Sequence, residues 1–133
     1  MIIGIGSDIA RVARFETALE RHGERFARRL LGEGEQEVFA GHAHPAAFLA
    51  KRFAGKEAFV KALGLGFRRG IEWGDIQVLN DALGKPLLHL GGRAAEQAQL
   101  AGVQHSHVTL SDEAEYAVAF VILEGQGRKT RSV

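Results

Sequence analysis

The stretch from Lys51 to Gly64 holds the side chains best suited to chemistry. Apolar residues recur along it and just before it at helical spacing, which predicts one helix with a buried stripe: Leu49, Phe53, Val60 and Leu63. Most of its polar side chains are basic: Lys51, Arg52, Lys56 and Lys61. A single acid, Glu57, lies among them. A lone carboxylate in a basic setting suits a divalent metal ion that also contacts phosphate groups.

Glu57 and Asp8 each have a simpler interpretation as well. Glu57 precedes Lys61 by four residues, so the two share a helical face, and an ion pair there would contribute only about 0.2–0.5 kcal/mol. Asp8 lies near the end of an apolar stretch, where Asp is a favoured cap of the following helix. The competing hypothesis is that both carboxylates bind one Mg²⁺, which takes one or two carboxylates, several waters and substrate phosphate. From the residues alone, a cap is the preferred role for Asp8.

Length and composition indicate one globular domain. The chain has 133 residues, 46% hydrophobic and 25% charged, with a net charge of +1 that excludes no class of partner. It has no cysteine, which excludes a disulfide framework and a thiolate zinc site. No stretch reads as a signal peptide or is long enough to span a bilayer, so we expect a cytoplasmic protein without a membrane partner.

The pattern predicts elements that must position these side chains. We expect strands over 2–9, 76–79, 87–90, 103–110 and 116–123, and helices over 12–31, 35–40, 46–63 and 92–101. Gly4 and Gly6 indicate a close approach of another backbone to the first strand. Strands and helices mix without regular βαβ alternation, which favours an α+β fold. The predicted domain spans 1–124, and 125–133 is expected to be a flexible polar tail.

Three further motifs could bind a partner. The first helix carries exposed basic residues suited to an acidic protein, chiefly Arg14, Arg21, Arg25 and Arg28. Nucleic acid is not expected, because no aromatic residues interleave with the arginines. The histidine pairs His42/His44 and His105/His107 lack a third metal ligand at supportive spacing, so polar or phosphate-contacting roles are preferred. The Gly84-Lys85-Pro86 turn could hold a lysine at the edge of a ligand.

Taken together, four segments in order resemble the bacterial holo-acyl-carrier-protein synthases, which are 4′-phosphopantetheinyl transferases. They are 4–9 followed by Arg11 and Arg14, 53–58 with 61–64, the segment containing Asn80-Asp81 and Gly84-Lys85-Pro86, and 107–112. The resemblance runs from about Ile3 to Leu123. It implies a small antiparallel-rich sheet packed with a long N-terminal helix and a central helix. It also implies a homotrimer with active sites at subunit interfaces.

The resemblance further implies a reaction and a role for each site residue. Such enzymes transfer the 4′-phosphopantetheine arm of coenzyme A to a serine of apo acyl carrier protein, in fatty acid biosynthesis, and release adenosine 3′,5′-bisphosphate. By resemblance, Asp8 and Glu57 bind Mg²⁺, which overrides the cap, and Lys61 steadies the departing phosphate. Gly84, Lys85, Pro86 and His107 would contact the nucleotide end of coenzyme A, and the arginines would receive the acidic carrier.

Two points stay open at this stage. The general base could be Asp112, a metal-bound water, Glu57 or a substrate phosphate oxygen, and many relatives have His where this chain has Asp112. The alternative function is a non-catalytic module that docks an acidic partner through its arginine-rich first helix.

Overall fold

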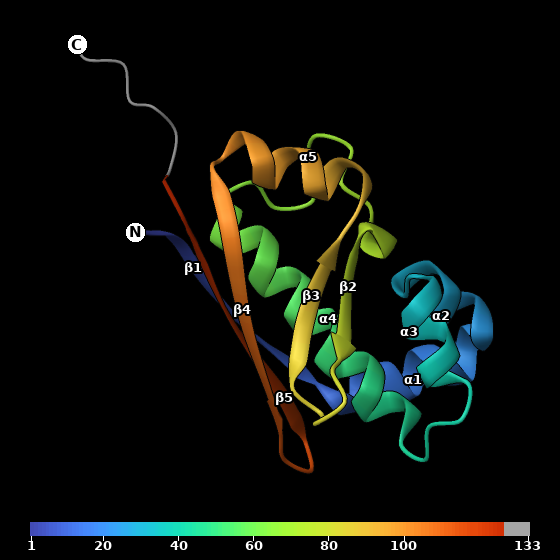
Figure 1. Ribbon diagram of the computed structural model, residues 1–133. Helices are drawn as coiled ribbons and strands as arrows, with labels where there is room; N and C mark the ends of the chain where they lie inside the picture. The colour runs from blue at the N-terminus through green and yellow to red at the C-terminus, as the bar shows by residue number, and fades with distance from the viewer. Residues whose placement is uncertain (127–133) are drawn as a thin grey trace.

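Three long strands form an antiparallel sheet of order β1-β5-β4 in the computed structural model, which describes residues 1–126 (Figure 1). β1 spans Ile2–Arg11, β4 spans Val103–Asp112 and β5 spans Tyr116–Gly125. β2 (Ile76–Asn80) and β3 (Pro86–Leu90) pair as a separate antiparallel hairpin. Together with the helices, these two sheets confirm the predicted α+β class.

Helix α4 (Pro45–Leu63) is the centre of the fold. It packs on β1, β5 and β4 on one side and contacts α1 and β2 on the other, as Figure 1 shows. Its side chains are therefore buried nearly all round, and Leu49, Phe59 and Val60 are fully buried. The other helical elements are α1 (Val12–His22), α2 (Glu24–Leu30), α3 (Glu33–Phe39), α5 (Gly92–Leu100) and the short 3₁₀ turn Trp73–Asp75.

The two glycines of β1 allow this strand to lie directly on α4. A Cβ atom on Gly4 would be 2.0 Å from the carbonyl oxygen of Ala62, and one on Gly6 would be 2.0 Å from that of Ala58. No side chain fits in such a space, so the predicted close backbone approach is confirmed. The contact brings Asp8, which follows Gly6 on the same face of the strand, beside the helix.

The single helix predicted over 12–31 is wrong, because α1 and α2 are separate helices. Gly23 lies between them with φ 57° and ψ −144°, a conformation that glycine adopts without the steric cost of a Cβ. The apolar periodicity continues across the break, so the sequence pattern does not reveal it. The tail boundary also shifts, since Gly125 is part of β5 and its N–H donates to the carbonyl oxygen of Met1. Residues 127–133 of the predicted tail lie outside the described residues.

Two of the basic side chains predicted on the polar face of α4 are inside the protein. Lys56 is fully buried, with its Nζ 2.6 Å from Oε1 of Glu35. Arg52 is also buried, and its guanidinium lies 4.2 Å from the ring centre of Phe48. The basic surface around Glu57 is therefore smaller than the sequence suggests. Within residues 1–126, no helix is both long and apolar enough to cross a membrane.

Candidate functional site

Asp8 faces α4 from the middle of β1. Its neighbours on that face, Gly6 and Ala10, are buried. Lys61 of α4 donates to Oδ1 of Asp8 at 2.9 Å and to the carbonyl oxygen of Ser7 at 3.0 Å. The helix cap preferred for Asp8 from the residues alone is wrong, since the N-cap of α1 is Arg11, without a side-chain capping bond.

Glu57 is one turn before Lys61 on α4, on the same side as Asp8. Burial raises the pKa of Glu57, and the charge of Asp8 raises it further, while Lys61 and Arg14 act in the opposite direction. The predicted Glu57–Lys61 ion pair is wrong, because the ion pair of Lys61 within residues 1–126 is with Asp8. Two carboxylates thus lie within electrostatic range of each other and of one exposed lysine.

These two carboxylates fit a divalent cation with substrate phosphate as a further ligand. Oδ2 of Asp8 is buried and has no hydrogen-bond partner within residues 1–126, so it is an oxygen free to act as a ligand. The described residues contain no group of three His, Cys, Asp or Glu side chains that could hold a metal ion. A two-carboxylate set suits Mg²⁺, which keeps waters and binds phosphate, better than it suits zinc.

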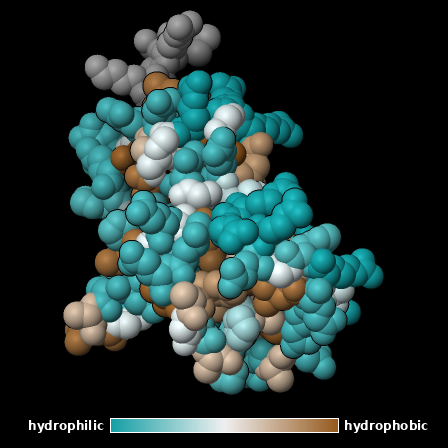
Figure 2. All heavy atoms as spheres, turned by 90° about the vertical axis from the view of Figure 1, so that its right-hand side faces the viewer, coloured by the Kyte–Doolittle hydropathy of each residue, from teal (hydrophilic) through white to brown (hydrophobic). Residues whose placement is uncertain are grey.

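The arginines predicted to bind the carrier lie on α1 and α2. Arg14, Arg21, Arg25 and Arg28 are all exposed. Figure 2 views the molecule from the side on which α1, α2 and α3 lie, and that surface is largely hydrophilic. Arg14 extends toward α4, with its guanidinium 4.9 Å from the ring centre of Phe53. Arg28 lies 3.7 Å from Glu24 in an exposed ion pair.

An aromatic pocket adjoins Arg14 beside the carboxylates. It has a volume of about 260 Å³ and is lined by Arg14, Phe15, Phe26, Arg29, Leu30, Phe53 and Trp73. Phe53 is one helical turn before Glu57, so this aromatic pocket is next to the carboxylate site. Sequence reasoning missed Arg29 and Trp73 as members of a site. The signals available were the run Arg28-Arg29 and the single tryptophan of the chain.

The residues predicted to bind the nucleotide do not join Asp8 within one chain. The turn from Asp81 to Lys85 is rigid, because the carboxylate of Asp81 accepts from the N–H groups of Leu83 and Lys85. It connects β2 and β3, outside the three-stranded sheet. His107 lies on β4 and is exposed, whereas its neighbour Val108 packs on the core. His107 and Asp8 therefore occupy opposite faces of that sheet.

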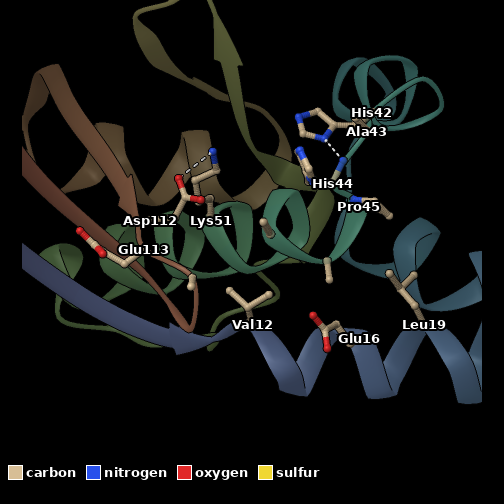
Figure 3. A pocket seen from close by; sticks show the side chains of 13 residues that line it. Val12, Glu16, Leu19, His42, Ala43, His44, Pro45, Lys51, Asp112 and Glu113 are labelled. Carbon is tan, nitrogen blue, oxygen red and sulfur yellow. Dashed lines mark hydrogen bonds and ion pairs between the residues drawn. The ribbon is translucent and has the colours of Figure 1, made fainter.

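A larger pocket of about 710 Å³ lies where α1, the loop before α4 and the β4–β5 turn meet. Figure 3 shows Lys51 and Asp112 pointing toward each other at one end of it, with Nζ 3.3 Å from Oδ1. His42 also lines this pocket, and its pKa is lowered by burial and by the charges of Lys51 and Arg52. Lys51 is six residues before Glu57, or about 9 Å along the helix. Asp112 is thus paired at a distance from the carboxylate site.

Comparison with known proteins identifies the family of this chain. Residues 4–121 match the model of the 4′-phosphopantetheinyl transferase superfamily. The holo-acyl-carrier-protein synthase of Photorhabdus laumondii is 55% identical over 92% of this chain and 98% of its own length. The chain therefore belongs to the holo-acyl-carrier-protein synthases of that superfamily, which confirms the resemblance seen in the sequence.

Solved structures of this family share the fold. The crystal structure of the Neisseria meningitidis synthase has a TM-score of 0.88 and 38% identity, covering 93% of this chain and 99% of its own. The Bacillus anthracis synthase, in complex with CoA (3′,5′-ADP), has a TM-score of 0.78 and 37% identity, covering 95% of this chain and 99% of its own. The fold predicted from the resemblance is thus confirmed.

Proposed function

We propose that this protein transfers the 4′-phosphopantetheine group of coenzyme A to a serine of apo acyl carrier protein. The observation that carries the proposal is the site of Asp8, Glu57 and Lys61 in a member of this family. A free buried carboxylate oxygen, a second carboxylate and a lysine on one helix face supply the groups needed to bind a metal and a pyrophosphate. Coenzyme A bound to the B. anthracis relative supports the same substrate here.

The residues have distinct roles in the proposed reaction. The serine oxygen attacks the phosphorus next to pantetheine, the bond to the nucleotide phosphate breaks, and adenosine 3′,5′-bisphosphate leaves with the electron pair. Asp8 and Glu57 would hold Mg²⁺, which supplies charge neutralisation at the pyrophosphate. Lys61 is 51% exposed at its side chain, so its ammonium group can turn from Asp8 to the departing phosphate.

The serine proton needs an acceptor near the carboxylates. The pairing of Asp112 with Lys51, away from Glu57, argues against Asp112 as the general base. Glu57 lies beside Asp8 on the helix face of the proposed site, so it stays a candidate for the general base. The remaining candidates are therefore Glu57, a metal-bound water and an oxygen of the substrate phosphate.

The carrier would dock on the arginines and the aromatic pocket. Arg14 belongs to both, and it lies close enough to Glu57 to lower the pKa of that carboxyl. An acidic carrier helix on α1 and α2 would thus bring its serine beside the carboxylate site. Because the contact is between exposed charges, its rate and affinity should fall as salt rises.

A mass spectrum tests the proposed function. Apo acyl carrier protein incubated with coenzyme A, Mg²⁺ and this protein should gain the mass of the phosphopantetheine arm. No gain with several bacterial carriers would contradict the proposal. The alternative, a non-catalytic docking module, predicts carrier binding that is indifferent to coenzyme A and to EDTA. A rise in melting temperature with coenzyme A plus Mg²⁺ would exclude that alternative.

We also propose that the protein works as a homotrimer built on the outer face of the three-stranded sheet. On this face Ile5 is 58% exposed, Ile9 is 62% exposed and Phe120 is 40% exposed. They lie side by side with Val118 by strand register, which makes an apolar patch that further copies of this chain would cover. His107 lies on this same face, so a neighbouring copy could bring it to a site that its own chain does not reach.

Sedimentation of the native protein and of Phe120→Lys tests the assembly. We expect a trimer for the native chain and a smaller, less active species for the variant. A native monomer with full transfer activity would contradict it. Magnesium dependence and a cytoplasmic location stay predictions. Measuring transfer activity with and without EDTA tests the magnesium dependence directly.

A further inference from the structure

The buried ion pair Lys56–Glu35 takes no part in the reaction above, although Lys56 precedes Glu57. Both side chains are fully buried, and each of their polar atoms has a hydrogen-bond partner. Lys56 also donates to the carbonyl oxygens of Trp73 and Ile76, and Glu35 accepts from the N–H groups of Gly32 and Val78. Apolar side chains of the same volume often stabilise a core as well as such a pair does. Stability alone therefore does not account for it.

One hydrogen-bond partner of this pair lines the aromatic pocket, and another lies two residues beyond a lining residue in sequence. Trp73, which receives a hydrogen bond of 3.0 Å from Lys56, lines that pocket itself. The N–H of Gly32 donates a hydrogen bond to Glu35, and Gly32 comes two residues after Leu30, which lines the aromatic pocket. Phe53, another lining residue, is three residues before Lys56 on α4. The ion pair thus hydrogen-bonds to one lining segment and lies close in sequence to the lining residues of α2 and α4, while α1 supplies the fourth segment.

The rings of the pocket depend on the placement of Trp73. Its indole stacks on Phe53, with ring centres 5.2 Å apart and planes at 24°. Phe53 in turn contacts Phe15 of α1, with ring centres 5.3 Å apart. Trp73 also contacts Phe67 of the loop after α4, with ring centres 3.8 Å apart. A shift of the Trp73 backbone would therefore move the whole row of rings.

We propose that Lys56 and Glu35 are positioning residues for carrier docking. Their directional hydrogen bonds hold Trp73 and the end of α2 against α4, so that a carrier seated in the aromatic pocket presents its serine to the Glu57 side of the helix. This inference rests on the proposed function, in which the pocket receives the carrier. A charged pair suits the task because its bonds specify one arrangement, whereas apolar packing tolerates several.

Lys56→Met tests the proposal, with Arg52→Met as the matched control. Arg52 is a buried cation on the same helix, stacked on Phe48, and it has no hydrogen bond to Trp73 in the described residues. Trp73 is the single tryptophan, so intrinsic fluorescence reports its surroundings directly. We expect Lys56→Met to shift the emission to the red and to weaken binding of apo carrier about tenfold or more. Its KM for coenzyme A should stay within about twofold.

Arg52→Met should lower stability and leave both the emission and the carrier Kd as in the native protein. Equal carrier affinity in the Lys56 and Arg52 variants would overturn the proposal. If the native protein itself does not bind apo carrier, the proposed function fails as well, so the two failures are distinguishable.

Two further measurements keep the test decisive if Lys56→Met does not fold. Glu35→Gln keeps the shape and removes the anionic partner, and it should weaken carrier binding in the same way. In the native protein, hydrogen exchange of the Gly32 and Val78 amides, both bonded to Glu35, should slow when the carrier binds. Unchanged exchange at both amides would count against the proposal.

Discussion

Lys56 and Glu57 are neighbours in the chain, yet their surroundings on α4 are opposite. Lys56 is fully buried and donates to three oxygens, so nothing is left for a ligand. Glu57 is partly buried beside Asp8, a like charge, and both carboxylates are attracted to Lys61, while Arg14 acts on Glu57 as well. The difference teaches that one helix can use a closed set of polar contacts for architecture and an open set for chemistry.

The largest expected effect is a difference in unfolding free energy between variants of two lysines on α4. Lys56→Met leaves a buried carboxylate without its partner and should cost about 3–5 kcal/mol of unfolding free energy. Lys61→Met removes a pair whose lysine side chain is 51% exposed, so solvent screens it and the loss should be smaller, roughly 1 kcal/mol. Urea unfolding followed by circular dichroism measures both. Equal losses would mean that the two ion pairs do not differ as described.

The next effect is on activity. Here substitutions in the open carboxylate site should matter most, whereas the buried ion pair dominates stability. Asp8→Asn and Glu57→Gln should each lower phosphopantetheine transfer by about 10²–10³-fold, because each removes an anionic ligand of the proposed Mg²⁺, whose charge would neutralise the reacting phosphates. The conversion of apo carrier, followed by mass spectrometry, measures the rates. Glu37→Gln, an exposed carboxylate on α3, is the matched control and should keep native activity. Native rates in the Glu57 variant would exclude it as a metal ligand.

The smallest effect is a change of stability with pH at Glu57. Its raised pKa means that the folded protein holds this proton more tightly than the unfolded chain does, so ionised Glu57 disfavours folding above that pKa. Glu57→Gln should therefore raise the melting temperature of the metal-free protein at pH 7. The gain should vanish as the pH falls below the ordinary value of 4.5, where the native carboxyl is protonated in both states. A gain that is independent of pH would point to packing instead.

Element types could be predicted from the sequence because each depends on local periodicity. The strands, the central helix and the β2–β3 hairpin all occur where expected, with ends that differ by up to two residues. The contact of Gly4 and Gly6 with α4 was predictable as well, since glycine inside a strand often marks the close approach of another backbone. Gly23 was not, because the apolar spacing of Phe15, Leu19 and Phe26 continues across it.

The role of a side chain also depends on what it faces in the fold, and this could not be predicted from local periodicity. Lys56 reads as a surface base until Glu35 is placed against it, and the two are 21 residues apart. Arg14 has Phe15 beside it in sequence, but only the fold brings the distant Phe53 to its guanidinium. His107 shares a strand with core residues, and only the sheet shows that it faces away from Asp8.

By itself, the sequence determined the family, the α+β class and the identity of Asp8, Glu57 and Lys61 as the candidate groups, because motif order and helical spacing are properties of the chain. The tertiary structure alone decided which charged side chains are accessible to a ligand and which are enclosed by protein partners. It paired Lys61 with Asp8, enclosed Lys56 with Glu35 and, within the described residues, left one oxygen of Asp8 free. The physical reason is that desolvation and hydrogen bonding depend on what surrounds a side chain in space, and most of those surroundings come from distant parts of the chain.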